Sequence, residues 1–287
     1  MRRRHRCVPV AVCLVLAVLL AGGGILLSVR GDWRYRVLYT LAPVQAQVLE
    51  AVEPDWASQE WEVTALVSDG LVTVEDTLLL INQAHPLEDG YEPEVVSLGD
   101  WRMTAATRTA FEALRARVEC ETGERLLIRS AYRSWDEQQA ELAQGGEAVA
   151  AQPGESEHEA GMALDVCVRG FGGRAFLKTA AGRLVNRTCA EEGFVVRYPL
   201  GKASVTGFAF EPWHLRYVGR VHAEAMAAGH LTLEEYILGM VPGQWYARGD
   251  VLILRSADAA IRLPASFIRC TISPDGCGYW IYTVEVG

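Results

Sequence analysis

The sequence predicts an α+β protein that begins with a transmembrane helix and ends in a small β region. Three observations support this prediction. An uncharged apolar run occupies residues 7–29, helical and strand-like segments follow one another between about residues 76 and 240, and short β-like runs separated by turn residues fill residues 243–287. We therefore divide the chain into residues 1–30 (basic tail and anchor), 31–75 (juxtamembrane segment), 76–240 (central domain) and 241–287 (C-terminal β appendage).

The N-terminus has the features of a membrane signal. Four arginines within residues 2–6 precede the apolar run, and a helix of this length spans about 30 Å of hydrocarbon. Ala21–Gly24 resembles a cleavage site, but Ile25–Leu27 continues the apolar run, so we expect an uncleaved anchor rather than a signal peptide. Positive charge stays cytoplasmic. We therefore expect a single-pass protein of the cell membrane whose later domains are extracytoplasmic.

The charge balance argues against nucleic acid as a partner. Residues 1–30 hold five of the 27 basic residues and none of the 36 acidic ones, so the rest of the chain is strongly acidic. Nucleic-acid binding depends on basic side chains that neutralise phosphates. We expect no nucleic-acid partner.

Spacing and turn residues predict the elements that follow the anchor. Trp33–Val52 has the pattern of a partly amphipathic helix, and short strands are expected within residues 56–74. Apolar residues at helical spacing predict a helix over Thr104–Thr122, with Gly123 as its C-terminal cap. We further predict strands over Arg125–Arg129 and Met162–Val168, helices over Lys178–Glu192, Gly219–Gly229 and Leu233–Met240, and β-like runs at Val251–Leu254, Phe267–Ile272 and Tyr279–Val286.

The segment Ser156–Asp165 offers two potential metal ligands, His158 and Asp165. They are seven positions apart, which corresponds to roughly 23 Å on a strand or 10 Å on a helix. Bonds to zinc are only about 2 Å long, so the chain must turn back between the two residues. Gly161 fits a reversal that needs positive φ. We expect His158 on a loop or strand end and Asp165 on the strand that follows.

A second segment, Glu211–His214, offers another imidazole and another carboxylate. Pro212 fits the first turn of a helix, where residues three apart lie on one face. Glu211 and His214 would then face one point, with His214 as a metal ligand and Glu211 just outside the ligand sphere as general base. Arg133 adds a planar cation suited to an oxyanion or a carboxylate.

Together these residues have the composition of a catalytic zinc site. Such a site has three nitrogen or oxygen ligands from the protein, one open position for water, and a nearby carboxylate that accepts the proton of that water. Neither His-x6-Asp nor Glu-x-x-His is specific alone. Their occurrence together, with Gly161 at the turn and Trp213 before His214, favours the catalytic interpretation.

The cysteines form no metal-binding pattern of their own. Cys270 and Cys277 bracket a Pro-Asp-Gly turn, and a hairpin there could bring the two sulfurs together in a disulfide. Cys167 lies two residues after Asp165, on the same face of the predicted strand. Its thiolate is therefore an alternative zinc ligand, and a buried inert thiol is the other interpretation.

Ser156–Asp165 and Glu211–His214 resemble the corresponding motifs of VanY-type D-alanyl-D-alanine carboxypeptidases, in the M15 family of zinc metallopeptidases. Leu79–Leu87, Gly193–Pro199 and Phe210–Gly219 also resemble segments of that family, so the likeness covers about residues 76–240. It implies a small antiparallel sheet flanked by helices, the fold shared with the Hedgehog signalling domain.

The resemblance also implies the role of each site residue. It implies zinc (Zn2+) on His158, Asp165 and His214, with Glu211 as base. Arg133 would stabilise the transition state or hold the terminal carboxylate of the substrate. The implied reaction removes the C-terminal D-alanine from a peptidoglycan stem peptide that ends in D-Ala-D-Ala. Three further residues fall where related enzymes contact the terminal D-alanine: Gln138, Ser156 and Tyr198.

Two other functions remain open at this point. Residues 144–154 form a shorter segment than the aromatic-containing stretch of the relatives, so an L,D-carboxypeptidase, a D,D-dipeptidase or a wall endopeptidase could use the same zinc. A non-catalytic, zinc-containing wall-binding protein is the other possibility. Glu211 argues against it, because a purely structural metal site needs no base.

Overall fold

The computed structural model describes residues 48–145 and 151–287. The anchor predicted at residues 1–30 and the first part of the helix predicted over Trp33–Val52 lie outside the described residues. Within the described ranges, no helix is both long and apolar enough to cross a membrane.

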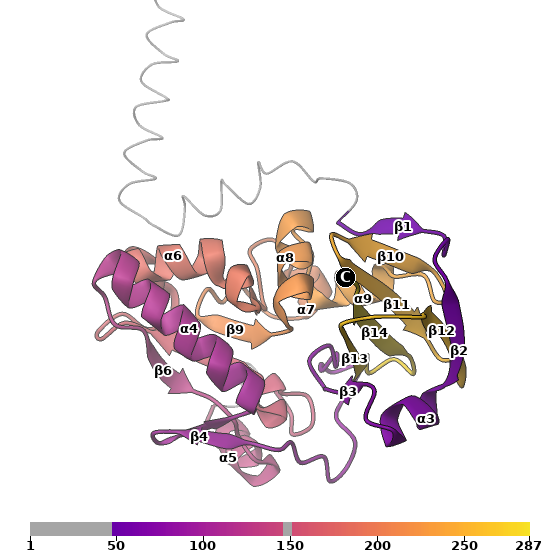
Figure 1. Ribbon diagram of the computed structural model, residues 1–287. Helices are drawn as coiled ribbons and strands as arrows, with labels where there is room; N and C mark the ends of the chain where they lie inside the picture. The colour runs from indigo at the N-terminus through magenta and orange to yellow at the C-terminus, as the bar shows by residue number, and fades with distance from the viewer. Residues whose placement is uncertain (1–47, 146–150) are drawn as a thin grey trace, which may run out of the picture. The chain divides into compact units, whose positions relative to one another are not determined.

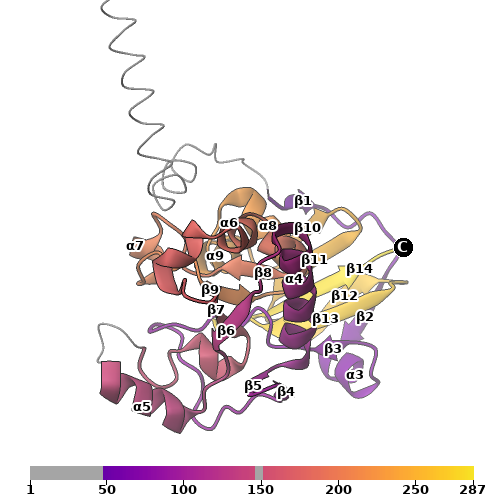
Figure 2. The ribbon, with the colours of Figure 1, turned by 90° about the vertical axis from the view of Figure 1, so that its left-hand side faces the viewer.

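A four-stranded antiparallel sheet carries the central domain, as expected for the predicted α+β fold (Figure 2). Its strand order is β6-β7-β9-β8. The register places Asp165 on β7 opposite Ser130 on β6 and opposite His214 on β9. Polar side chains that are far apart in sequence therefore meet across the middle of the sheet. The four strands are β6 (Leu127–Ser130), β7 (Ala163–Cys167), β8 (Phe194–Val196) and β9 (His214–Tyr217).

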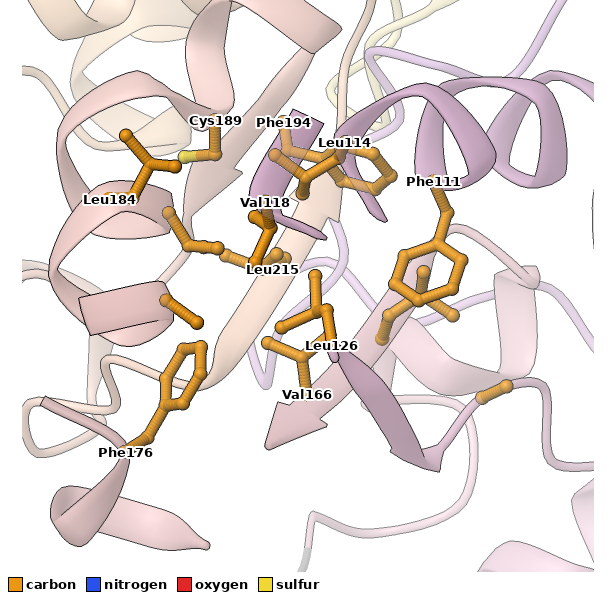
Figure 3. Packing of buried hydrophobic residues seen from close by; sticks show 14 of the residues in the cluster. Phe111, Leu114, Val118, Leu126, Val166, Phe176, Leu184, Cys189, Phe194 and Leu215 are labelled. Atoms are coloured by element: carbon orange, nitrogen blue, oxygen red, sulfur yellow. The ribbon is translucent and has the colours of Figure 1, made fainter. Parts of the chain in front are cut away.

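Helix α4 (Ala105–Thr122) covers the sheet. Thr104 caps its first turn by accepting a hydrogen bond from the backbone N–H of Thr107, and Gly123 ends it at a φ of 70°, a conformation that glycine adopts without strain. The predicted helix and its cap are thus confirmed. The buried face of α4 packs on the sheet beside α6 (Figure 3), and the residues of this core include Phe111, Leu114, Val118, Leu126, Val166, Phe176, Leu184 and Leu215.

The other elements of the central domain surround this core. The predicted helix Lys178–Glu192 is divided into α6 (Ala180–Thr188) and the 3-10 helix η3 (Cys189–Glu192), and it ends at Gly193 with a φ of 82°. The remaining elements are the hairpin β4 (Val96–Leu98) and β5 (Trp101–Met103), α5 (Trp135–Gly145), η1 (Glu157–Ala160), η2 (Gly173–Lys178), α7 (Ala203–Thr206), α8 (Arg220–Gly229) and α9 (Leu233–Gly239).

Strands from both ends of the described chain share two further sheets, which we call the β module (Figure 1). A six-stranded sheet has the order β1-β10-β11-β14-β13-β3, and a two-stranded sheet pairs β12 with β2. All these pairs are antiparallel except β13–β3. The elements are β1 (Glu50–Val52), β2 (Ser58–Glu62), α3 (Val63–Ser68), β3 (Thr73–Val74), β10 (Trp245–Arg248), β11 (Val251–Ser256), β12 (Ala260–Pro264), β13 (Arg269–Pro274) and β14 (Trp280–Glu285).

The β module packs on α8 and α9 through a continuous apolar cluster that contains Tyr236, Ile253 and Ile281. His222 on α8 crosses this interface. Its ring nitrogens lie 2.8 Å from the Tyr236 hydroxyl and 2.9 Å from the Thr283 hydroxyl. Burial lowers the pKa of His222 to about 3, so this imidazole is neutral at ordinary pH and the interface holds no buried charge at this point.

Two expectations outside the central domain are corrected, and one open possibility is decided. Residues 50–52, predicted as the end of a helix, form strand β1 because β10 offers them a pairing edge. Residues 63–68, predicted as strand, form α3. The disulfide that was possible between Cys270 and Cys277 is not formed, and both residues are free thiols. The turn between them is organised instead by the buried carboxylate of Asp275, which accepts hydrogen bonds from two backbone N–H groups and pairs with Arg255 at 2.7 Å.

Changing Leu114 to Ala is expected to lower the free energy of unfolding by about 2–5 kcal/mol, because a fully buried leucine leaves a cavity when it is truncated. Urea unfolding followed by tryptophan fluorescence measures the change. Glu119→Ala, at an exposed position on the same helix, is the matched control and should shift stability by no more than about 0.5 kcal/mol. Equal losses in the two variants would contradict the assignment of this face of α4 to the core.

Candidate metal centre and active site

The turn between His158 and Asp165 has the predicted reversal. His158 lies on η1, a single turn of 3-10 helix, rather than on the expected loop or strand end. Gly161 follows at a φ of 67°, and its N–H donates to the carbonyl of His158 at 3.1 Å. The chain then enters β7, where Asp165 is placed as predicted. The tight turn brings two residues that are seven positions apart to the same end of the sheet.

His214 is not on a helix, and this expectation is corrected. Pro212 and Trp213 form a turn, and His214 is the first residue of β9. The turn is closed by a hydrogen bond from the N–H of His214 to the carbonyl of Glu211 at 3.2 Å. The Asn186 side chain holds the Pro212 carbonyl at 2.8 Å. A turn closed from residue i to residue i+3 brings the two ends together much as a helical turn does, so Glu211 and His214 still converge.

Three ligand atoms meet at one point. Nε2 of His158 lies 3.7 Å from Oδ1 of Asp165, and Nδ1 of His214 lies 3.0 Å from the same oxygen. All three residues have a ligand atom within 4.8 Å of the others. Donor atoms that surround a zinc ion tetrahedrally with bonds of about 2.0–2.1 Å are about 3.4 Å apart. The observed separations therefore fit a single zinc ion.

Hydrogen bonding fixes which nitrogen of each imidazole faces this point. Nδ1 of His158 lies 2.8 Å from the carbonyl oxygen of Ala131. A carbonyl can only accept, so Nδ1 carries the proton and Nε2 has a free lone pair. Burial lowers the pKa of His158, which keeps it neutral as a metal ligand must be. Oδ1 of Asp165 is buried and faces the ring nitrogens of both histidines, as expected of an oxygen that shares one cation with them.

His214 is the ligand most affected by its neighbours. Burial lowers its pKa, but hydrogen bonding and charge from Asp165 and Glu157 outweigh burial and raise the pKa to about 9. In the absence of metal, the site therefore retains a proton on His214 at neutral pH. The same negative surroundings favour a divalent cation, which replaces that proton. Cys167 does not belong to the group of ligand atoms found among the described residues.

All eight residues singled out in the sequence line one cavity of about 370 Å³. Oε2 of Glu211 is 3.9 Å from Nδ1 of His214, and its side chain is 27% exposed. It therefore borders the metal position and also reaches the open cavity. Burial raises the pKa of Glu211, which makes it a stronger base than a solvated carboxylate.

The other four predicted residues surround the ligands. Nε of Arg133 is buried without a hydrogen-bond partner among the described residues, and Oε1 of Gln138 is in the same condition. Nε2 of Gln138 donates to the carbonyl of Ala151 at 2.8 Å. Tyr198 stacks on Phe208 with ring centroids 4.6 Å apart. Ser156 is buried directly before η1. The unpartnered donor and acceptor leave polar capacity for a ligand in the cavity.

A buried cluster of four charges, which we call the buried ion network, lies behind His214. Glu157 is fully buried and pairs with Arg197 at 2.6 Å and with Arg216 at 3.2 Å. Arg197 also donates to Glu234 at 2.9 Å. Burial alone would raise the pKa of Glu157, but the two arginines outweigh it and hold this pKa far below its usual range. The other oxygen of Glu157 lies 3.7 Å from Nε2 of His214, so a fixed negative charge faces the outer nitrogen of a metal ligand.

Sequence reasoning missed the buried ion network. Glu157 lies within the motif Ser156–Asp165, and Arg197 and Arg216 lie within segments already recognised as family-like. Charged residues are normally assigned to the surface, and no local pattern reveals a pair separated by 40 positions. A usable signal was the presence of charged residues inside the family-like segments Ser156–Asp165, Gly193–Pro199 and Phe210–Gly219.

The geometry defines a class of protein before any comparison is made. Two imidazoles and one carboxylate converge on a cation position, a second carboxylate borders it, and an arginine faces the same cavity. This is the arrangement of a zinc-dependent hydrolase that activates water.

Comparison with known proteins gives the family. A profile described as VanY: D-alanyl-D-alanine carboxypeptidase matches residues 100–220. The bifunctional D-Ala-D-Ala dipeptidase and D-Ala-D-Ala carboxypeptidase VanXYC of Enterococcus gallinarum is 34% identical over 179 residues, which are 56% of this chain and 93% of that protein. The chain belongs to the VanY family, within the M15 zinc metallopeptidases.

Solved structures agree with this assignment. The LdcB LD-carboxypeptidase is 34% identical with a TM-score of 0.52, and the match covers 56% of this chain and 86% of that one. The D,D-pentapeptidase VanY from a VanB-type resistance cassette, solved with Zn(II), is 30% identical with a TM-score of 0.50, and the match covers 57% of this chain and 99% of that one. Zinc is the cofactor expected at His158, Asp165 and His214.

Zinc affinity should rise with pH between about 6.5 and 9. The pKa of His214 is raised from its ordinary value of 6.5 to about 9 in the metal-free site, and zinc must displace that proton. This one group should increase the affinity about tenfold per pH unit, as measured by competition with a chromophoric chelator. The stability of the metal-free protein has the opposite trend. The raised pKa of His214 stabilises the folded state, and this stabilisation is complete below pH 6.5 and is lost as pH rises through 9. An affinity that does not change over this range would contradict the assignment.

Changing Glu157 to Gln should weaken zinc binding about 10–100-fold, since it removes the charge that faces the outer nitrogen of His214. The free energy of unfolding should fall by about 3–5 kcal/mol, because Arg197 and Arg216 lose their buried counter-charge. Chelator competition and urea unfolding measure the two effects. Glu224→Gln breaks an exposed ion pair with Arg220 and should change neither quantity noticeably. Unchanged zinc affinity in a folded Glu157→Gln protein would show that the charge does not act on the metal site.

Proposed function

We propose that this chain is a D,D-carboxypeptidase that removes the C-terminal D-alanine from peptidoglycan stem peptides. The observation that carries the proposal is the convergence of the His158, Asp165 and His214 ligand group with Glu211 and Arg133 in one cavity. Relatives of the same family with D-Ala-D-Ala carboxypeptidase activity in their names support the choice of bond.

Glu211 has the position of the catalytic base. Its carboxylate borders the metal ligands and opens onto the cavity, so it can accept a proton from an attacking water and then deliver that proton to the leaving amine. Zinc, when bound, polarises the scissile carbonyl and lowers the pKa of the attacking water. Burial raises the pKa of Glu211, which suits a group that must both accept and return a proton near neutral pH.

Arg133 and its neighbours form the subsite for the terminal residue. The guanidinium of Arg133 is the group suited to the free carboxylate of the terminal D-alanine or to the oxyanion that develops during attack. Ser156, Gln138 and Tyr198 supply two hydroxyls and an amide around the same space. Their roles follow the resemblance to related carboxypeptidases. The free Oε1 of Gln138 can accept a hydrogen bond from an N–H of the substrate.

The site of action proposed for this enzyme is outside the cytoplasm. The arginine-rich start and the apolar run at residues 7–29 support a single membrane anchor. A wall substrate is extracytoplasmic, so this placement agrees with the proposed reaction.

An L,D-carboxypeptidase is the second candidate, because the LdcB LD-carboxypeptidase matches this chain at least as closely as the D,D-specific VanY structure does. The products separate the candidates. From a pentapeptide ending in D-Ala-D-Ala, a D,D-carboxypeptidase releases one D-alanine and a dipeptidase-like cut releases D-Ala-D-Ala. From the tetrapeptide ending in one D-alanine, only an L,D-enzyme releases D-alanine. Mass spectrometry with and without a chelator gives the answer, and D-alanine released from the tetrapeptide alone would overturn the D,D assignment.

Changing Glu211 to Gln should lower kcat by about 10²–10⁴-fold, because it removes the proton acceptor. Zinc affinity should remain within a few-fold of the wild-type value, because Glu211 lies outside the ligand group. Chelator competition tests the second expectation on the same sample. Glu119→Gln, on the exposed face of α4, is the control for a loss of one negative charge. Retained turnover in Glu211→Gln would remove this residue from the mechanism.

A further inference from the structure

Arg129 is a second cation on the wall of the active-site cavity that the proposed reaction does not use. It lies on β6, close to the ligand Asp165, and its side chain is exposed and lines the cavity. In the described part of the chain no carboxylate lies within ion-pair distance of it, although the cavity also contains acidic side chains. An unpaired guanidinium that faces a substrate cavity has the chemistry to bind a substrate anion.

A β-bulge accounts for the direction of this side chain. The β6–β7 register pairs Ile128 with Val166 and Ser130 with Asp165, so Arg129 is an extra residue without a partner on β7. On a regular strand, adjacent side chains point to opposite faces. Here both Arg129 and Ser130 line the same cavity. Bulges redirect side chains beside active sites, and this one adds Arg129 to the cavity wall.

The loop after β7 provides space for the guanidinium. A Cβ atom on Gly172 would lie 2.7 Å from Nη1 of Arg129 and 3.6 Å from its Cζ. Gly172 has a φ of −95°, which any residue can adopt. A side chain at this position would therefore compete with the end of the Arg129 side chain for space, whereas the backbone would accept it. The guanidinium therefore lies beside the loop that follows β7, in the space that Gly172 leaves open.

Arg129 does not belong to the subsite for the terminal residue. β6 and β8 are the two edges of the sheet, and β7 and β9 with the metal ligands lie between them. In the subsite for the terminal residue, Tyr198 follows β8 and Arg133 follows β6, whereas Arg129 lies within β6 beside the loop that holds Gly172. Arg133 already provides a cation for the terminal carboxylate. An anion bound at Arg129 therefore comes from another part of the substrate.

We infer that Arg129 forms a subsite for a second substrate carboxylate, carried by the side chain of the residue that precedes D-Ala-D-Ala. This inference rests on the proposed carboxypeptidase function and adds a selectivity to it. The enzyme prefers stem peptides whose third residue ends in a free carboxylate over those in which this group is a carboxamide. The preference is set by Arg129, redirected by the β-bulge and accommodated by Gly172.

The test compares peptides that differ in one charge. The substrates are N-acetylated peptides ending in D-Ala-D-Ala, in which the preceding residue is diaminopimelate with a free or an amidated side-chain carboxyl, together with a shorter Glu and Gln pair. We expect the wild-type enzyme to show a kcat/KM about tenfold higher for the acid than for the amide in at least one pair, as for a charge-assisted hydrogen bond. In Arg129→Gln this ratio should fall to about one.

Two further variants make the result specific. Gly172→Ala displaces the guanidinium without removing its charge, and it should reduce the acid-to-amide ratio by at least half. Arg220→Gln, an exposed arginine on α8 outside the cavity, should leave the ratio at its wild-type value. Zinc affinity, measured on each variant, should not change in step with the acid-to-amide ratio of kcat/KM.

The outcomes distinguish this inference from the proposed function. If wild-type enzyme cleaves both members of each pair equally well, or if Arg129→Gln retains the acid preference, the Arg129 subsite is wrong while the carboxypeptidase assignment stands. If wild-type enzyme loaded with zinc releases D-alanine from no peptide, the proposed function fails and the subsite fails with it.

Discussion

The fold of the central domain depends on a fully buried carboxylate, that of Glu157, held between Arg197 and Arg216. Removing these charges from water is expensive unless all of them are paired at once. Four segments supply the charges: Glu157 is on η1, Arg197 follows β8, Arg216 is on β9 and Glu234 is on α9. Arg216 also donates to the backbone carbonyls of Thr77 and Leu79. The segments that shape the metal site are therefore stable only together. The same network places a negative charge 3.7 Å from the outer nitrogen of His214, so folding and metal binding depend on one group of contacts.

The polar and charged residues around the cavity are of two kinds, which differ in whether they are paired with other protein groups or face the cavity. Glu157, Arg197, Arg216 and Glu234 form ion pairs with one another in the interior, so their charges are compensated there. By contrast, Asp165, Arg133 and Gln138 each present a polar atom without a hydrogen-bond partner among the described residues. Interior polar groups are rarely left unpaired. The unpaired atoms of Asp165, Arg133 and Gln138 face the cavity, where metal and peptide can complete their interactions, and the paired charges form the support beneath them.

Much of the central domain was predictable because its signals are local. Gly161, Gly123 and Gly193 have the positive φ values that a reversal or a helix end requires, and the buried residues of α4 follow helical spacing. The turn at Pro212 and Trp213 was assigned to a helix, because the three-residue spacing of Glu211 and His214 fits both. Pairings between distant segments had no local signal: β1 with β10, the ion pairs of Glu157, and the bulge that turns Arg129 toward the cavity.

Strands from the first and last thirds of the chain pair in common sheets, and this pairing limits how far the catalytic domain can be shortened. The apolar sides of α8 and α9 have the β module as their cover, and the backbone N–H of Leu78 is satisfied by the hydroxyl of Ser273, 195 positions away. A fragment trimmed to the central domain would expose the apolar sides of α8 and α9 to water and would lose the Ser273 hydroxyl that accepts from Leu78. The strands of the β module are thus needed for a stable catalytic domain, and an expressed fragment should include those on both sides of it.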